Sequence, residues 1–255
     1  MTSKYPDSVL PRIRTLVQET LTCQAETVQL ALEMHFAQRL GALRGLLACC
    51  LGEAQPAMDV GVALDLVHVS LQRLHVRLED GTGVPAMMGT GPCVLAGDYL
   101  TSAAFKVLIR CRDLPVLDRV ARTITRTCEQ DNRALEPDAR GLSRNRRRAA
   151  LDLALAGVAA EAGAVLSGHA ELARPARRLG LRLQALHALT ALVEHSEGEE
   201  ARGYRARAQR ALEGARRAAR QLEHRLDPAL GLAGRAGDLV NFVAQALRQS
   251  KPTLA

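Results

Sequence analysis

The sequence predicts an all-α protein, on three observations. Ala, Leu and Arg, all good helix formers, dominate a chain of 255 residues in which 47% are hydrophobic and 24% charged. Aromatic residues account for only 2% and Trp is absent, which disfavours β-sandwiches and β-barrels. Apolar residues recur at helical spacing along most of the chain. A chain of this length can bury one large core, so we expect a single helical domain over residues 1–255.

The helices are expected where the apolar pattern has a helical period. The clearest case is 97–111, in which apolar residues repeat at i, i+3, i+4, i+7 and i+8 from Leu100. Pro115 fits the first turn of the helix that follows. The segments that we expect to be helical are residues 8–22, 25–52, 57–79, 97–111, 115–134, 147–167, 171–195, 199–226 and 233–248.

Gly and Pro mark the breaks between these helices. The one clear loop is expected from Asp80 to Pro92, which contains Gly81, Gly83, Pro85, Gly89 and Gly91. Further breaks are expected at Gly168, Gly198 and Asp227-Pro228. The Arg-rich run that ends at Arg148 predicts an exposed junction over residues 136–148. No internal repeat or long linker divides the chain.

The charge is distributed unevenly along the chain. The net charge is +7, but residues 1–100 hold 7 Lys and Arg against 10 Asp and Glu, and residues 101–255 hold 27 against 17. Arg-rich helices can bind phosphate or acidic surfaces, and they can equally be solvated faces. The six cysteines form no C-x-x-C pair, and no uncharged apolar run approaches the ~20 residues of a membrane span. We therefore expect a cytoplasmic protein, with peripheral membrane contact left open.

Three segments resemble one enzyme family. Val94-Leu-Ala-Gly-Asp-Tyr-Leu100, followed by Ala103-Ala104-Phe105, is similar to the "VLAGDYLxxxAF" stretch of the polyprenyl diphosphate synthases. Residues 64–71 resemble the helix that leads into that family's first aspartate motif, and residues 178–184 resemble the segment before its second. The resemblance extends over about residues 30–245, and it implies a helical bundle of the isoprenoid synthase type.

The residues that catalysis needs in that family are missing here. Active members hold Mg²⁺ on two aspartate-rich clusters and clamp diphosphate with basic residues. Of the family's basic "G-K-R-x-R-P" segment, only one residue has a counterpart here, Arg44. The family's "R-R-G-x-P" segment corresponds to residues 81–85, where both arginines are absent. The resemblance therefore implies no catalytic residue and no metal ligand in this chain. The positions of the lost aspartate clusters are His75, Val76 and Glu79 for the first, and His187, Ala188 and Ala191 for the second.

A fold without its catalytic residues implies a role beside an active partner. Heterodimeric heptaprenyl and hexaprenyl diphosphate synthases pair an Asp-motif catalytic subunit with a small subunit that lacks those motifs. The resemblance implies such a regulatory subunit, a pseudoenzyme that is inactive alone, stabilises the catalytic subunit and influences product length in isoprenoid quinone (menaquinone) side-chain synthesis. It implies no cofactor bound by this chain, with Mg²⁺ in the partner.

The resemblance also implies a partner interface on the helix that follows Gly97-Asp98 and on the next helix. Gly97 and Asp98 are then structural, as a turn and a helix N-cap, and Gln184 is structural as well. The apolar stripe could instead pack only against the chain's own core. The residues expected to face the partner are Leu100, Ala103, Ala104, Val107, Leu108, Leu117, Val120 and Ile124.

Two other functions remain open at this point. The cluster Arg144–Arg148 and the Arg-rich segment 202–225 could form a basic module that binds nucleic acid or an anionic membrane. Nucleic acid is the less expected ligand because stacking aromatics are scarce. An enzyme of altered chemistry in the same fold could use Glu79 or Asp80 as a remaining metal ligand.

Overall fold

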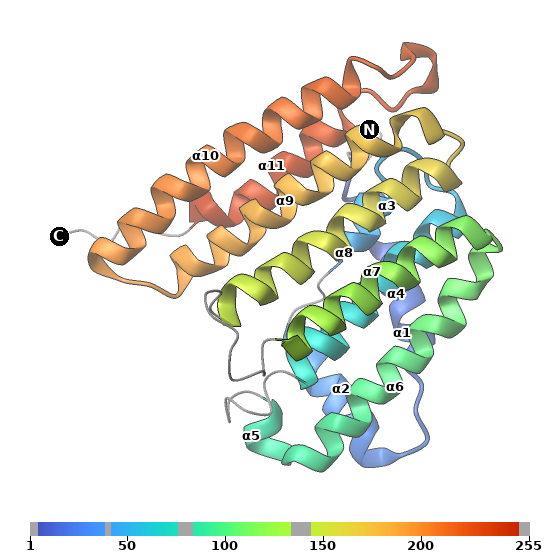
Figure 1. The fold of residues 1–255 in the computed structure, drawn as a ribbon, viewed down its shortest axis with the longest axis vertical. Helices are drawn as coiled ribbons and strands as arrows, with labels where there is room; N and C mark the ends of the chain where they lie inside the picture. The colour runs from blue at the N-terminus through green and yellow to red at the C-terminus, as the bar shows by residue number, and fades with distance from the viewer. Residues whose placement is uncertain (1–4, 39–41, 76–83, 134–143, 250–255) are drawn as a thin grey trace.

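The computed structural model describes residues 5–38, 42–75, 84–133 and 144–249, and all regular structure within them is helical. The all-α prediction is confirmed. A π-helical turn, η1 (Ser70–His75), continues α4, and a 3₁₀ turn, η3 (Ile109–Cys111), continues α6. The α-helices in Figure 1 are α1 (Leu10–Thr20), α2 (Glu26–Gln38), α3 (Leu43–Cys49), α4 (Gln55–Val69), α5 (Val84–Met88), α6 (Thr90–Leu108), α7 (Leu114–Arg133), α8 (Arg144–Leu166), α9 (Ala173–Glu194), α10 (Gly198–Glu223) and α11 (Arg235–Gln249).

The long helices pack side by side in chain order over the second half of the molecule. Helix α8 packs on α7 and α9, and α9 packs in turn on α10, with α11 against both α9 and α10 (Figure 1). Helices α3 and α4 pack on each other and on α8, and α6 covers another side of α4. Helix α9 therefore separates the α3–α4–α8 layer from the α10 surface.

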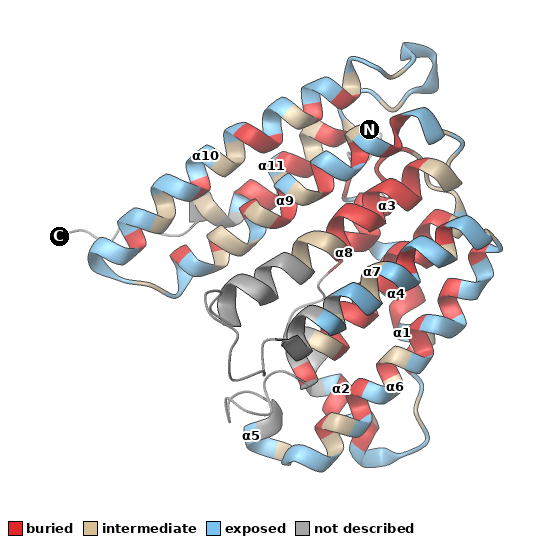
Figure 2. Cartoon of the chain, in the orientation of Figure 1, coloured by how far each residue is buried: buried red, intermediate tan, exposed pale blue. Residues whose placement is uncertain are grey.

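The centre of the core is α4. Every residue from Ala57 to Val69 is buried, including Asp59, Asp65 and His68. A helix that is apolar on all sides belongs in the interior, and its charged side chains then require partners inside the protein. Figure 2 shows the same burial along α3 and the middle of α8. One connected cluster of buried side chains runs from Tyr5 to Ala244, so both ends of the described chain share this core.

Small residues bring these central helices close together. A Cβ on Gly61 of α4 would lie 2.7 Å from the Cα of Gly45 in α3. A Cβ on Gly163 of α8 would lie 2.5 Å from the Cα of Ala48 in α3 and would overlap the carbonyl oxygen of Ala48. At both places backbone meets backbone, so only glycine fits without a shift of a helix.

The structure corrects several of the expected boundaries. In the described part of residues 25–52 the structure has α2 and α3, which end and begin at Gln38 and Leu43. Helix α8 begins at Arg144, inside the expected junction, whose residues 136–143 lie outside the described part. The expected loop 80–92 contains α5 and the start of α6. Gly97 and Asp98 form neither a turn nor an N-cap, because α6 runs through them and its N-cap is Gly89 with φ +81°. The Gly97 carbonyl accepts a hydrogen bond from Ser70 Oγ at 2.7 Å.

The contact at Gly163 gives a test of the close packing. Gly163→Ala places a methyl group against the Ala48 backbone, and we expect the free energy of unfolding to fall by about 3 kcal/mol. Gly203→Ala on exposed α10 meets nothing within 4 Å and should be neutral or stabilise the helix by about 0.5–1 kcal/mol. Urea unfolding of both variants measures the difference, and equal stability of the two would contradict the packing described here.

Candidate functional site

The guanidinium of Arg44 lies at the centre of a buried polar cluster. Arg44 is 2% exposed and is the second residue of the short helix α3. Its Nη1 lies 3.5 Å from Oδ1 of Asp65, and its Nη2 lies 3.0 Å from Nδ1 of His68. Nη2 is also 3.4 Å from Oε1 of Gln184 and 3.7 Å from Oδ1 of Asp152. Helices α4, α8 and α9 thus bring side chains to one cation, which α3 carries.

Asp65 connects this cluster to the start of α3. The N-cap residue of α3, Ala42, offers no side-chain acceptor, so the first amides of the helix need an acceptor from elsewhere. Asp65 of α4 accepts hydrogen bonds from the backbone N–H groups of Arg44 at 3.1 Å and Gly45 at 2.8 Å. One carboxylate therefore caps α3 and pairs with the Arg44 side chain.

Burial dominates the protonation equilibrium of Asp65. It raises the pKa of Asp65 to about 6, while the Arg44 charge and the two backbone amides oppose that increase. At neutral pH the carboxyl group is ionised, and both amides and the guanidinium are directed at it. Below about pH 6 it takes up a proton inside the folded protein.

His68 and Asp152 complete the cluster on its α8 side. Nδ1 of His68 lies 2.8 Å from Oδ1 of Asp152 as well as 3.0 Å from Nη2 of Arg44. Nδ1 can hydrogen-bond to only one of these two groups at a time. A protonated Nδ1 donates to Asp152, and an unprotonated Nδ1 accepts from Arg44. A protonated His68 supplies a second positive charge, and the cluster then holds two cations and two carboxylates.

The sequence matches no family model and no curated protein, but the fold matches solved structures over nearly its whole length. Heptaprenyl diphosphate synthase from Staphylococcus aureus aligns with a TM-score of 0.76 at 12% identity, covering 96% of this chain and 98% of that one. Decaprenyl diphosphate synthase from Rhodobacter capsulatus gives 0.69 at 14% identity, covering 92% and 95%. Geranyltranstransferase from Thermotoga maritima gives 0.65 at 19% identity, covering 95% and 97%. The chain has the fold of the trans-prenyl diphosphate synthases.

The helical bundle expected from the resemblance is therefore confirmed. Within this prenyl synthase fold, the structure brings together two residues from separate family-like segments, Arg44 and Gln184, whose side chains are hydrogen-bonded. Gln184 is 3% exposed and points inward from α9. The resemblance left Arg44 as a single remaining cation, and the structure shows that Asp65, Asp152 and His68 surround it.

The positions of the lost aspartate clusters lie only partly within the described residues. His187 is exposed on α9, and Ala188 and Ala191 are half-buried on the same helix. His75 ends η1, its side chain is outside the description, and so are Val76, Glu79 and Asp80. Within the part of the chain that the structure describes, no three His, Cys, Asp or Glu side chains are grouped to hold a metal ion.

Most of the stripe that we expected to face a partner is buried within this chain. The side chains of Leu100, Ala103, Ala104, Val107, Leu108 and Val120 are buried in the chain's own fold, and Leu117 and Ile124 are half-buried against the same core. The other interpretation of the stripe, as a core face, is what the structure shows. By length and apolar content alone, residues 90–111 could also cross a membrane, but this buried face packs inside the protein.

The exposed side of α6 and η3 carries other apolar residues. Leu95, Phe105, Ile109 and Leu114 expose 58, 44, 62 and 76% of their surface, and Met87 of α5 exposes 73%. These five account for most of the large hydrophobic side chains that are exposed in the described residues. Sequence periodicity found the amphipathic helix, but it did not distinguish the face that meets the core from the face that remains outside.

Sequence reasoning also missed Asp65, His68 and Asp152. A signal was present for two of them, because Asp65 and His68 interrupt an otherwise uncharged, mostly apolar run from Val60 to Val69. A charged residue inside such a run indicates a buried group with a specific partner. The identity of that partner, Arg44, lies 21 residues away from Asp65 and required the fold.

The raised pKa of Asp65 predicts a pH effect on stability. An unfolded Asp releases its proton near pH 3.8 and the folded Asp65 near pH 6, so the folded state binds more protons between these values and its stability falls as the pH rises. Asp65→Asn lacks this titration. We expect the free energy of unfolding of the unmodified chain, minus that of Asp65→Asn, to decrease by on the order of 2–3 kcal/mol from pH 4 to pH 7. Urea unfolding across this range measures it; a flat or rising difference would contradict the assignment.

Proposed function

We propose that this chain is a non-catalytic subunit of a heteromeric trans-polyprenyl diphosphate synthase. The observation that carries the proposal is the state of Arg44 within a prenyl synthase fold. The one cation left from the family-like basic segment is buried and paired with the chain's own carboxylates, Asp65 and Asp152. A guanidinium that is already compensated in this way is a poor ligand for a substrate diphosphate.

The residues expected to hold Mg²⁺ support the same proposal. Residues 187–191 of α9 read His-Ala-Leu-Thr-Ala, with no carboxylate to bind a hard cation. Without bound Mg²⁺ the charge of a departing diphosphate is not neutralised. The chain therefore retains the scaffold, and we assign metal binding and catalysis to an Asp-motif partner in the cytoplasm.

The partner would gain stability and a defined product length from this subunit. Two of the similar structures are named for long products, the heptaprenyl and decaprenyl diphosphates, which fits synthesis of the isoprenoid side chain of a quinone. A subunit packed beside the catalytic bundle can limit how far a growing chain extends by the size of the side chains that it contributes.

We place the partner contact on the exposed side of α6, η3 and the start of α7. Leu95, Phe105, Ile109 and Leu114 lie there, and Met87 of the adjoining α5 is exposed as well. Apolar groups on one exposed face are typical of a protein interface. Phe105 and Ile109 are four residues apart, one helical turn, so they can be buried together by one partner helix.

A prenyl-elongation assay tests the proposed function. Allylic and isopentenyl diphosphates are supplied with Mg²⁺ to this chain alone, to a candidate Asp-motif synthase from the same genome alone, and to the two proteins co-purified. We expect no product from this chain alone and either new activity or a longer product from the mixture. The proposal fails if this chain is active by itself, or if the candidate partner alone has full activity and the same product length.

Two substitutions test where the partner binds. Phe105→Glu and Ile109→Glu place charge in the proposed interface, and we expect each to weaken the complex at least tenfold, because central apolar contacts dominate such interfaces. Leu192→Glu on α9 is the matched control, since Leu192 is also 42% exposed but lies away from α6. Isothermal titration calorimetry measures affinity, and thermal unfolding checks that the free chains remain folded. If all three variants bind the partner with equal affinity, this face is not the partner interface.

A further inference from the structure

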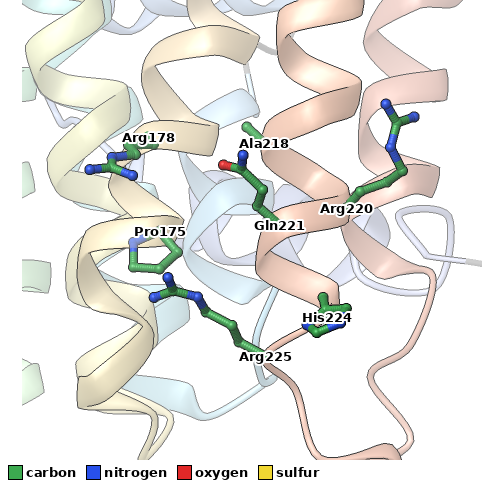
Figure 3. Close-up of a pocket in the computed structure, with 7 residues that line it drawn as sticks. All are labelled: Pro175, Arg178, Ala218, Arg220, Gln221, His224 and Arg225. Atoms are coloured by element: carbon green, nitrogen blue, oxygen red, sulfur yellow. The ribbon is translucent and has the colours of Figure 1, made fainter.

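A cationic hollow lies between α9 and α10, on the side of α9 away from the Arg44 cluster. Its volume is about 430 Å³. Figure 3 shows Gln221 and Arg225 extending from the α10 side toward α9, with Arg225 reaching towards Pro175, whereas Arg220 extends away. The residues that line it are Pro175, Arg178, Ala218, Arg220, Gln221, His224 and Arg225, none of them acidic.

The helical spacing of these residues explains the shape of the hollow. Pro175, Arg178 and Arg182 follow one face of α9 at i, i+3 and i+7. Gly214, Ala218, Gln221 and Arg225 lie at i, i+4, i+7 and i+11 from Gly214, also on one face. A Cβ at Gly214 would lie 3.5 Å from Nη1 of Arg182, so the two rows meet there. Small residues form the floor and guanidinium groups form the rim.

The arginines around the hollow have no carboxylate partner among the described residues, a state that they share with other exposed arginines such as Arg216 of α10. Arg12, Arg44, Arg119, Arg177 and Arg235 each pair with a carboxylate. Within the described residues, Arg178, Arg182 and Arg225 pair with none.

The nearest carboxylates along the chain are already engaged. Glu223 Oε1 accepts the N–H of Gly237 at 2.9 Å, and Asp227 Oδ1 accepts the N–H of Ala229 at 2.9 Å. Neither carboxylate forms an ion pair with Arg178 or Arg225 in the described residues.

Helix electrostatics does not account for the cations on α9. Positive side chains are favourable near the C-terminal end of a helix and unfavourable near its N-terminal end. His224 and Arg225 follow the last residue of α10 and fit this preference. Arg178 is the sixth residue of α9, beyond its first turn, so the helix end does not favour its charge.

We propose that this hollow binds a phosphate-bearing anion through Arg178, Arg225 and Gln221. Guanidinium groups donate paired hydrogen bonds to phosphate oxygens, and a Gln amide adds a neutral donor. The uncapped start of α9 adds positive potential to the same region. Such an anion reaches the site either as a soluble diphosphate or as the headgroup of an anionic lipid. The inference goes beyond the proposed subunit function and is measurable on this chain alone.

The test uses inorganic diphosphate in calorimetric titrations at low salt. The variant is Arg178→Gln/Arg225→Gln, which removes the two charges proposed to bind the anion and keeps polar side chains. The control is Arg216→Gln, an exposed arginine of α10 that lies about 160° around the helix from Ala218. We expect the double variant to weaken binding at least tenfold and the control to change it less than twofold. Circular dichroism verifies that both variants fold.

A second arm distinguishes the two sources of the anion. Vesicles of phosphatidylcholine with and without phosphatidylglycerol are sedimented with each protein. Binding of diphosphate but not of vesicles, lost in the double variant, supports a soluble ligand. Binding of phosphatidylglycerol vesicles, lost in the double variant alone, supports a lipid headgroup. The proposal is overturned if neither probe binds, or if Arg216→Gln reduces binding as much as the double variant.

Discussion

The buried charge of Arg44 is the constraint on which the centre of this fold depends. A guanidinium inside a protein is tolerated only with carboxylates and hydrogen-bond acceptors around it, and removal of one partner from such a set typically costs about 3–5 kcal/mol. Here the partners come from α4, α8 and α9. The relative positions of these helices are therefore fixed by one side chain of α3, in addition to the apolar core.

Close helix packing makes that arrangement possible. Helix α3 has only seven residues, all of them buried, and it could not start inside the core without an acceptor for its first amides. Asp65 supplies the acceptor from α4, and the small residues at Gly45, Gly61 and Gly163 let the three backbones approach. Asp65 thus joins capping to ion pairing, and the glycine contacts let α3, α4 and α8 pack closely around it.

Helix α9 divides two kinds of arginine environment. On its inner side, Gln184 joins a cluster in which the cation is compensated by the chain's own carboxylates. On its outer side, Arg178 lines an open hollow in which such compensation is lacking among the described residues. Among the described residues, the cation on the inner side of α9 is paired within the chain, and Arg178 on its outer side is open to solvent.

The sequence alone determined the all-α class, the approximate place of most helices and the absence of carboxylates at residues 187–191, because composition, period and residue identity are local properties. The prediction of a loop was wrong for residues 84–92. Pro85 and Pro92 lie in the first turns of α5 and α6, positions that tolerate proline. Only the tertiary structure decided that Leu100 and Val107 face the core while Phe105 and Ile109 do not, since periodicity shows that a face is buried but not what covers it. It also decided the partners of Arg44, because Gln184 is 140 residues away along the chain and meets it only through the packing of α3 near α9.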